Sequence, residues 1–277
     1  MNRPVAYSGE PGAFAEDAVV AAFGEGAERL SVGGFREAFE AVADGRAGAA
    51  VLPIENLVNG SIRETYDLLL EFDHEIVREV VVPVALCLAA ASGVRIEDVV
   101  RVYSHIQALG QAERFLRGRP WALLTTYNTA GAGKLIAHSG EPGAAAVLSR
   151  RAAERFGLTI LAEGIQDVPD NRTRFVVTAL RAPGQPAPVD GTPYRTTVAF
   201  GVRNEPGTLL AALRVFAARG INLSKLESRP SRTAAWEYVF WADLDAHQDD
   251  PECAAALSDL AACTTMIRVF GSYERAS

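Results

Sequence analysis

The sequence has few of the residues that build metal sites and disulfide frameworks: three cysteines and four histidines in 277 residues. Cys87, Cys253 and Cys263 lie far apart and lack the paired spacing of a zinc site or a redox motif, so we interpret each as a small buried hydrophobic residue. The histidines, at positions 74, 105, 138 and 247, never fall within metal-ligand spacing of one another. We therefore expect no structural metal.

Long apolar runs and an excess of positive charge are also lacking. The longest unbroken apolar stretch, at positions 80–91, has 12 residues and contains Pro83, whereas a membrane span needs about 20. The first 12 residues hold no apolar segment of a secretory signal. Lys and Arg number 27 against 34 Asp and Glu, a net charge of −7, which argues against nucleic acid or an anionic membrane as partner. We expect a cytoplasmic protein, in which a pocket for a small anion remains possible.

The length and composition favour two folded domains. Hydrophobic residues make up 49% of the chain and charged residues 22%, which gives ample core material. Proline and glycine cluster at positions 181–193, where the apolar periodicity stops, as is typical of a linker. We therefore predict a first domain at 1–181, a linker at 182–193 and a second domain at 194–277.

The first domain alternates short apolar runs with helical patterns, which predicts α/β layering with mainly parallel sheets. Two consecutive runs around Pro83 have no helix between them, so we expect the chain to cross there from one lobe to another. The predicted lobes are residues 1–80 with 160–181, and residues 81–159. The predicted strands are 5–7, 49–52, 76–82, 85–90, 100–103, 121–125, 159–161 and 175–180, and the predicted helices are 14–23, 35–44, 61–71, 107–116, 129–137 and 144–156.

The second domain has a different pattern. Strands are predicted at 195–202, 221–228, 236–243 and 265–270, with helices at 207–219 and 251–261. This βαββαβ order indicates an α+β, ferredoxin-like unit of about 80 residues. Its core is modest, and such sheets often pair with a second copy.

Polar residues follow several strands of the first domain, among them Ser8, Asn56, Ser104 and Asn128. In open α/β sheets ligands bind at the carboxyl ends of strands, where helix N-termini favour anions. These side chains therefore predict a cleft for a multiply charged small molecule, although capping of the following helices is the simpler explanation for Ser104 and Asn128 taken singly. Capping and ligand contact are compatible. The glycines at positions 131 and 133 fit neither a phosphate loop nor a dinucleotide fingerprint, so we expect no cofactor.

Seven segments, taken in order, resemble the prephenate dehydratases, in the monofunctional form with a carboxyl-terminal ACT regulatory domain. They are GEPGAF (9–14), PIENLVNGSIRETYDLLL (53–70), SHIQAL (104–109), NTAGA (128–132), GIQDVPDNRTRF (164–175), NEPGTL (204–209) and ESRP (227–230). The sequence departs from the family at Leu57, Ile106, Asn128 and Thr208, where Ser, Pro, Ser and Ala are usual. Leu57 removes a potential hydrogen-bond partner beside the substrate, which bears on affinity and substrate choice more than on reaction type.

The resemblance implies a two-lobed catalytic domain like a periplasmic binding protein. It also implies conversion of prephenate to phenylpyruvate with loss of water and carbon dioxide. Thr173 matches the required threonine and is expected to donate a hydrogen bond to the departing hydroxyl, and Glu55 is the candidate acid or hydrogen-bonding partner, with a structural carboxylate as the alternative. The expected substrate-binding residues are Ser8, Asn56, Ser104, His105, Asn128, Thr129 and Arg172.

For the second domain the resemblance implies feedback inhibition by L-phenylalanine and assembly into homodimers or homotetramers. The expected phenylalanine-binding residues are Asn204, Pro206, Gly207, Thr208, Leu209, Asn222, Leu223, Glu227, Ser228 and Arg229. Two alternatives remain open. The chain also resembles the arogenate dehydratases, which act on the amino acid analogue of prephenate, and a non-catalytic amino-acid-sensing module would share the two-lobed form.

Overall fold

The computed structural model describes residues 3–182, 187–230 and 238–276, and its contacts divide the chain into two units. Unit 1 comprises residues up to 72 together with 80–177, and unit 2 comprises 73–79 with the chain from 178 onward. The predicted linker is therefore described only in part, because positions 183–186 lie outside these ranges. Among the described helices, none combines the length and the apolar character needed to cross a membrane.

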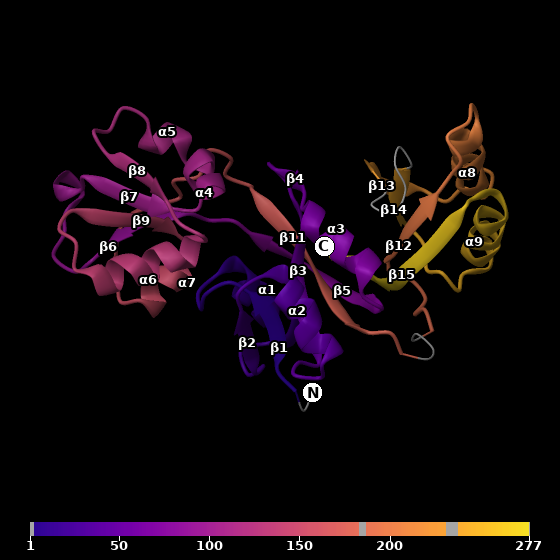
Figure 1. Ribbon diagram of the computed structural model, residues 1–277, viewed down its shortest axis with the longest axis horizontal. Helices are drawn as coiled ribbons and strands as arrows, with labels where there is room; N and C mark the ends of the chain where they lie inside the picture. Colours follow the sequence, from indigo (N-terminus) through magenta and orange to yellow (C-terminus); the bar gives the residue numbers. More distant parts are fainter. Residues whose placement is uncertain (1–2, 183–186, 231–237, 277) are drawn as a thin grey trace. The chain divides into compact units, whose positions relative to one another are not determined.

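Unit 1 has two α/β lobes, as predicted, and each is built on its own sheet (Figure 1). The first sheet has the order β2-β1-β3-β11-β5, with β4 paired to β3. Strand β1 is parallel to both of its neighbours, whereas β3 and β4 are antiparallel. The elements are β1 (Val5–Ser8), α1 (Phe14–Phe23), β2 (Arg29–Val32), α2 (Phe35–Ala43), β3 (Ala49–Asn56), β4 (Gly60–Ser61), α3 (Arg63–Glu71), β5 (His74–Pro83) and β11 (Arg172–Leu180).

The second lobe has a five-stranded sheet with the order β10-β6-β9-β7-β8. Strand β6 is antiparallel to β9 and β10, while β7 is parallel to β8 and β9, so the sheet is mixed and not mainly parallel as predicted. Its elements are β6 (Cys87–Ala90), β7 (Arg101–Ser104), α4 (Ile106–Gln111), α5 (Glu113–Leu116), β8 (Ala122–Thr125), α6 (Thr129–Ser139), β9 (Ala144–Leu148), α7 (Arg150–Arg155) and β10 (Thr159–Glu163), with a 3₁₀ turn at Ile96–Asp98.

The prediction of one helix at 144–156 was wrong. Its first part is β9, a central strand whose five residues are all buried, and only Arg150–Arg155 is helical. Alternate residues of β9 enter two apolar clusters on opposite faces of the sheet: Ala145 and Val147 lie with α4 and α5, and Ala146 and Leu148 lie with α6 and α7. A strand covered on both faces shows no polar alternation, so its alanine-rich sequence reads as helix.

The two lobes are connected by two crossings that lie side by side. The first, residues 84–86, follows Pro83 as predicted, but the second lies between β10 and β11, because β10 belongs to the second lobe and not to the first. Backbone hydrogen bonds join the crossings: Val84 N donates to Asn171 O at 2.8 Å and Ile165 N donates to Leu86 O at 3.1 Å. These bonds make the two connections a single hinge.

Two of the three cysteines are buried, as predicted. Cys87 and Cys253 are buried, and burial raises the pKa of each thiol to about 11, so neither is a nucleophile at neutral pH. Cys263 at the end of α9 (Pro251–Cys263) is exposed, which corrects the expectation that it is buried.

Unit 2 contains the predicted βαββαβ fold, with the antiparallel strand order β13-β14-β12-β15. Its elements are β12 (Tyr194–Gly201), α8 (Thr208–Ala217), β13 (Leu223–Pro230), β14 (Tyr238–Leu244), α9 and β15 (Met266–Glu274); the predicted start of β14 at 236 lies outside the described residues. One face of the sheet packs on α8 and α9 through residues such as Phe200, Leu244, Phe216 and Leu260.

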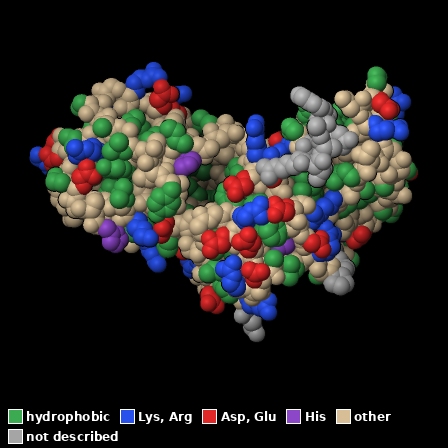
Figure 2. Space-filling model, in the orientation of Figure 1, with side chains coloured by type: hydrophobic (Ala, Val, Ile, Leu, Met, Phe, Trp, Pro, Cys, Tyr) green, Lys and Arg blue, Asp and Glu red, His purple; other side chains and the backbone are tan. Residues whose placement is uncertain are grey.

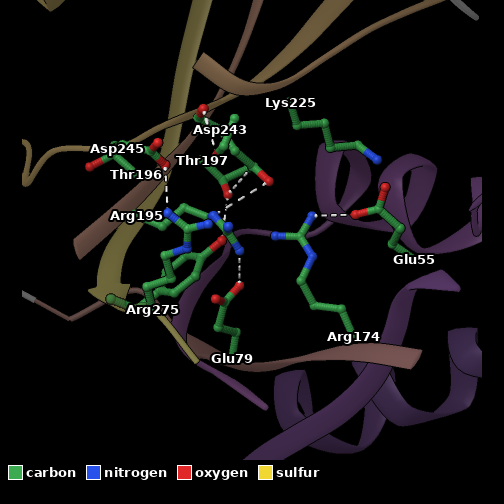
Figure 3. Close-up of polar contacts among 12 residues, drawn as sticks. Glu55, Glu79, Arg174, Arg195, Thr196, Thr197, Lys225, Asp243, Asp245 and Arg275 are labelled. Atoms are coloured by element: carbon green, nitrogen blue, oxygen red, sulfur yellow. Dashed lines mark hydrogen bonds and ion pairs between the residues drawn. The ribbon is translucent and has the colours of Figure 1, made fainter. Parts of the chain in front are cut away.

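The other face of this sheet holds a buried group of charges that includes a residue of β5 (Figure 3). Arg195 forms ion pairs with Glu79 and with Asp243, and all three residues are buried. Asp243 also accepts a hydrogen bond from Thr197 Oγ1 at 2.7 Å, and Glu79 accepts one from the backbone N–H of Ala276 at 2.9 Å. Glu79 therefore ties the first half of β5 to unit 2.

His74, at the start of β5, makes stability depend on pH. Burial lowers its pKa to about 4, with the charge of Asp73 opposing this and that of Arg268 adding to it. The folded state therefore disfavours protonation, so stability is full above the ordinary pKa of 6.5 and falls as the pH drops towards 4. From pH 7.5 to pH 5 we expect the free energy of unfolding to fall by about 2 kcal/mol through this group. Urea unfolding of wild type and His74→Leu at both pH values measures it, and equal pH dependence of the two would contradict the assignment.

Candidate active site

A cavity of about 590 Å³ lies between the two lobes of unit 1. Figure 2 shows the surface hollowed between these lobes. Residues of β1, β3, β11 and the hinge line the cavity from one side, and residues that follow β7 and β8 line it from the other. The expectation of a cleft where strands end is therefore confirmed by the position of this cavity.

Five helices begin at the cavity. The first residues or N-caps of α1, α2, α3, α4 and α6 all line it, namely Ala13 and Phe14, Phe35, Ile62 and Arg63, His105, and Asn128 and Thr129. Helix N-termini carry partial positive charge and unpaired N–H groups, and together they favour an anion. Arg63 adds a guanidinium, so the cavity suits a small molecule with more than one negative charge.

Thr173 and Asn56 come together on one wall of this cavity, from the neighbouring strands β11 and β3. Asn56 Nδ2 donates to Thr173 Oγ1 at 2.9 Å. Both residues are buried, and the Thr173 side chain is held on the strand that leaves the hinge. Because the hydroxyl oxygen already accepts from Asn56, the hydroxyl hydrogen is left to donate to a ligand.

Glu55 does not have the position that the candidate acid needs. Adjacent residues of a strand point to opposite faces of the sheet, so Glu55 points away from Asn56. Its carboxylate forms an ion pair with Arg174 at 3.1 Å, from the neighbouring strand β11 (Figure 3). Arg174 is adjacent to Thr173 in β11, so its side chain likewise points to the face of the sheet opposite that of Thr173. The geometry favours the alternative of a structural carboxylate, and we take Glu55 out of the candidate catalytic set.

Ser104 is also structural. It is fully buried at the end of β7, and its hydroxyl donates to Val147 O of β9 at 2.6 Å. The bond joins the two strands below the cavity. This corrects the expectation that Ser104 binds substrate. Arg172 is exposed and alternates with Thr173 along β11, so its side chain points away from the cavity wall.

The other expected binding residues line the cavity. Ser8 lies at the end of β1, and Thr129 is the first residue of α6. His105 and Asn128 each line the cavity and also cap a helix, so a capping role and the proposed contact with a ligand are compatible for both. His105 accepts from Gln107 N at 3.3 Å, and Asn128 Oδ1 accepts from Gly131 N at 2.5 Å.

A polar contact closes one edge of the cavity. Glu10, after β1, accepts hydrogen bonds from Tyr127 at 2.9 Å and pairs with Lys134 of α6 at 3.0 Å. Burial alone would raise the pKa of Glu10, but the hydrogen bonds from Lys134 and Tyr127 hold it below its usual value. Beside this contact Gly12 approaches α7 so closely that a Cβ would lie 2.6 Å from Ala152 Cα. Glycine at position 12 therefore permits the two lobes to meet here.

Two residues of the site were not predicted from the sequence. Arg63 lies in the SIRETY segment and lines the cavity. The feature of the sequence that could have identified it is a positive charge at the start of a predicted helix. Asn171 is buried and its Oδ1 accepts from Asn56 Nδ2 at 3.0 Å. The alternation of side chains along a strand could have identified Asn171, because it puts positions 171, 173 and 175 on the same face of the sheet.

The expected phenylalanine-binding residues form two groups in unit 2. The register pairs Gly201 and Arg229 with Val239 of β14, and it pairs Thr196 and Leu223 with Leu244. The group 204–209 with 227–229 therefore lies at one end of the sheet, and Asn222 with Leu223 lies at the other, about 17 Å away for five residues of strand. One copy of the domain thus separates the two groups.

Sequence comparison establishes the family. The pattern described as "Prephenate dehydratase" matches residues 5–182, and that described as "ACT domain" matches residues 196–262. The chain belongs to the prephenate dehydratase family. A prephenate dehydratase is a carbon–oxygen lyase, so the family match favours an enzyme over a non-catalytic sensing module.

Two curated relatives extend over nearly the whole chain. The bifunctional chorismate mutase/prephenate dehydratase of Aquifex aeolicus is 40% identical over 98% of this chain and 74% of its own length. Arogenate dehydratase/prephenate dehydratase 1 of Arabidopsis thaliana is 40% identical over 97% of this chain and 71% of its own length. The family thus includes relatives named for each of the two substrates.

Two solved structures have the same fold. Prephenate dehydratase of Arthrobacter aurescens in complex with L-Phe has a TM-score of 0.89 and 33% identity, over 98% of this chain and 90% of that one. The structure titled "GqqA- a novel type of quorum quenching acylases" has a TM-score of 0.90 and 32% identity, over 99% and 98% of the two chains. The fold alone therefore does not fix the substrate.

Proposed function

We propose that this protein converts prephenate to phenylpyruvate, with Thr173 as the hydrogen-bond donor to the departing hydroxyl. The observation that carries the proposal is the Asn56–Thr173 hydrogen bond at 2.9 Å, on the wall of a cavity at which five helices begin. The helix N-termini and Arg63 suit the two carboxylates of prephenate. Ser8, Asn128 and Thr129 are the proposed hydrogen-bonding partners of these carboxylates.

The reaction makes few chemical demands on the protein. The bond from C1 to its carboxylate breaks, carbon dioxide leaves, and the electron pair enters the ring, which becomes aromatic. The C4–O bond breaks at the same time, and the oxygen takes its bonding pair and a proton to leave as water. A threonine hydroxyl is a weak acid, so its role is to stabilise the charge that develops on this oxygen, with solvent supplying the net proton.

Arogenate is the alternative substrate. It differs from prephenate by an ammonium group in place of the side-chain ketone, and the Arabidopsis relative is named for both activities. Glu64 lines the cavity beside Arg63, and a carboxylate there is a suitable partner for the ammonium group. The two candidates share the Thr173 chemistry and differ only in the recognition of this side chain.

We propose that L-phenylalanine inhibits the enzyme by binding to unit 2 of two associated chains. The separation of the two groups of expected ligand residues supports a site that a second copy completes, in a homodimer or a tetramer of dimers. Strand β13, which carries the residues 227–229, is an edge strand of its sheet among the described residues. Gly207 begins α8 with a φ of +88°, and the N–H groups after it are the proposed partners of the amino acid carboxylate.

Parallel assays of both substrates test these proposals. Wild type is incubated with prephenate and with arogenate, each with and without L-phenylalanine, and phenylpyruvate or phenylalanine is measured. We expect turnover of prephenate that phenylalanine inhibits, and sedimentation of the protein as a dimer or larger. Turnover of arogenate alone would favour the alternative, and a protein inert with both substrates would reject the proposed function. Turnover insensitive to phenylalanine would reject the regulatory proposal alone.

A further inference from the structure

Three amide and hydroxyl groups at the cavity wall form a hydrogen-bonded chain whose direction is fixed. Asn56 Oδ1 accepts from the backbone N–H groups of Val58 at 3.1 Å and Asn59 at 3.0 Å. Since backbone N–H groups only donate, the carboxamide of Asn56 has one allowed orientation, with Nδ2 on the opposite side. Asn171 must then present its oxygen to that nitrogen, as it does at 3.0 Å.

The donor side of Asn171 has no corresponding partner. The residue is 1% exposed, and its Nδ2 is buried without a hydrogen-bond partner among the described residues. Leaving a buried donor unsatisfied is unfavourable. Asn171 lines a side cavity of about 410 Å³ that adjoins the main one, with Asn59, Gln107 and Gln111 lining both. Within the protein, the Asn171 side chain therefore makes its hydrogen bond through the oxygen that faces Asn56.

The backbone of Asn171 is anchored at the hinge. Its carbonyl accepts from Val84 N of the other crossing at 2.8 Å, and its N–H donates to Val168 O at 3.2 Å. Asn171 is therefore held by the connection between the lobes while its side chain holds Asn56. The same Asn56 nitrogen donates to Thr173 Oγ1, two residues further along β11.

We propose that Asn171 is a positioning residue, which orients Asn56 so that the Thr173 hydroxyl hydrogen points into the cavity. The inference rests on the proposed function, because it assigns Asn171 a part in the reaction of Thr173. Asn56 Nδ2 also donates to the carbonyl of Arg172 at 3.1 Å, so its two hydrogens are shared among three acceptors. Without the Asn171 oxygen, these hydrogens are redistributed between the Arg172 carbonyl and Thr173 Oγ1. The hydroxyl of Thr173 then loses its fixed direction although no residue that touches the reacting atoms has changed.

Two substitutions at position 171 separate this role from general loss of structure. Asn171→Ala removes the acceptor, and we expect kcat to fall about 10- to 100-fold, as for a misplaced catalytic group, while KM changes less than about threefold. Asn171→Asp keeps an oxygen towards Asn56 but replaces the unpartnered NH₂ group with a second carboxyl oxygen, which adds a charge at a buried position, so we expect its kcat to fall below that of wild type but less than that of Asn171→Ala. If aspartate is as damaging as alanine, the oxygen is not the group that matters.

A double-mutant cycle tests whether Asn171 acts through Thr173. In a Thr173→Val background, Asn171→Ala should change kcat less than about twofold, because the hydroxyl it orients is gone. An equal loss in both backgrounds would overturn the proposal. Gln166→Ala is the matched control, since Gln166 Oε1 accepts from Leu86 N at 3.0 Å in the same hinge without contacting Asn56, and it should keep wild-type kcat.

A measurement without substrate separates this inference from the proposed function. The ratios above use whichever of prephenate and arogenate wild type converts. Independently, NMR of protein labelled with ¹⁵N-asparagine should show the Asn56 side-chain amide more protected from exchange in wild type and Asn171→Asp than in Asn171→Ala, where only the Arg172 carbonyl and Thr173 Oγ1 remain as acceptors. If wild type is inert with both substrates but shows this pattern of protection, the proposed function is rejected and the positioning role of Asn171 is not. Protection in Asn171→Ala as strong as in wild type rejects the positioning role whatever the substrate.

Discussion

Thr173→Val is expected to lower kcat by about 10²–10⁴-fold, the usual contribution of a positioned proton donor, with a much smaller effect on KM. Valine keeps the branched shape of threonine, and Thr173 is only 8% exposed, so the fold has little reason to change. What is lost is the hydroxyl that accepts from Asn56 and donates towards the cavity. Steady-state kinetics with prephenate, at enzyme concentrations high enough to detect the residual rate, measure the effect.

Thr173→Ser supplies the control for this experiment. Serine keeps the hydroxyl and loses only a methyl group, so we expect it to recover most of the activity that valine removes. A valine variant with near-normal kcat would show that the hydroxyl takes no part in the reaction. A serine variant as inactive as valine would instead indicate that packing of the methyl group is what matters.

Arg195→Met should destabilise unit 2 by about 3–5 kcal/mol, because each of two buried carboxylates loses an ion-pair partner. Here two buried carboxylates, Glu79 and Asp243, lose the guanidinium that lies between them (Figure 3). Hydrogen exchange measured by mass spectrometry reports the opening free energy of β12–β15, and peptides of β1–β3 in the same sample give an internal reference.

Arg219→Met is the matched surface substitution. Arg219 pairs with Glu252 and Asp259, and both acidic partners are more than half exposed, so loss of this contact should cost under about 1 kcal/mol. If Arg195→Met has an equally small effect, the buried group of charges is not what stabilises unit 2.

Sequence patterns predicted most of the fold because the apolar periodicities are strong where one face of an element is polar. The order of strands and helices in unit 2 is as predicted, as are the two lobes and the crossing after Pro83. The failures concern two strands of the second lobe, of which β9 is fully buried and β10 is not. Strand β9 carries no alternation to distinguish it from a helix, and the lobe to which β10 belongs depends on pairing with β6, which is far away in the sequence.

Many residues of the candidate site were predicted from the sequence, but the directions of their side chains were not. Sequence motifs consist of adjacent residues, and both members of the pairs Glu55-Asn56 and Arg172-Thr173 were expected to take part in catalysis or substrate binding. Adjacent side chains of a strand point to opposite faces of the sheet, so only one member of each pair faces the cavity. Alternation along β11 was sufficient to separate Thr173 from Arg172 and to add Asn171. The pairing of Ser104 with Val147 was not predictable, because it depends on which strands are adjacent in the sheet.

Strand β5 belongs to both units, and this has a consequence for work with fragments. Glu79 lies at the end of the part that belongs to unit 2, and the next residue, Val80, belongs to unit 1. Deleting everything after position 181 would remove the contacts of Glu79 with Arg195 and with the backbone of Ala276, five residues before the hinge begins at Val84. The kinetics of such a shortened enzyme would therefore mix relief of inhibition with damage to the catalytic half. Point substitutions among the proposed phenylalanine-binding residues are the cleaner test of the proposed inhibition.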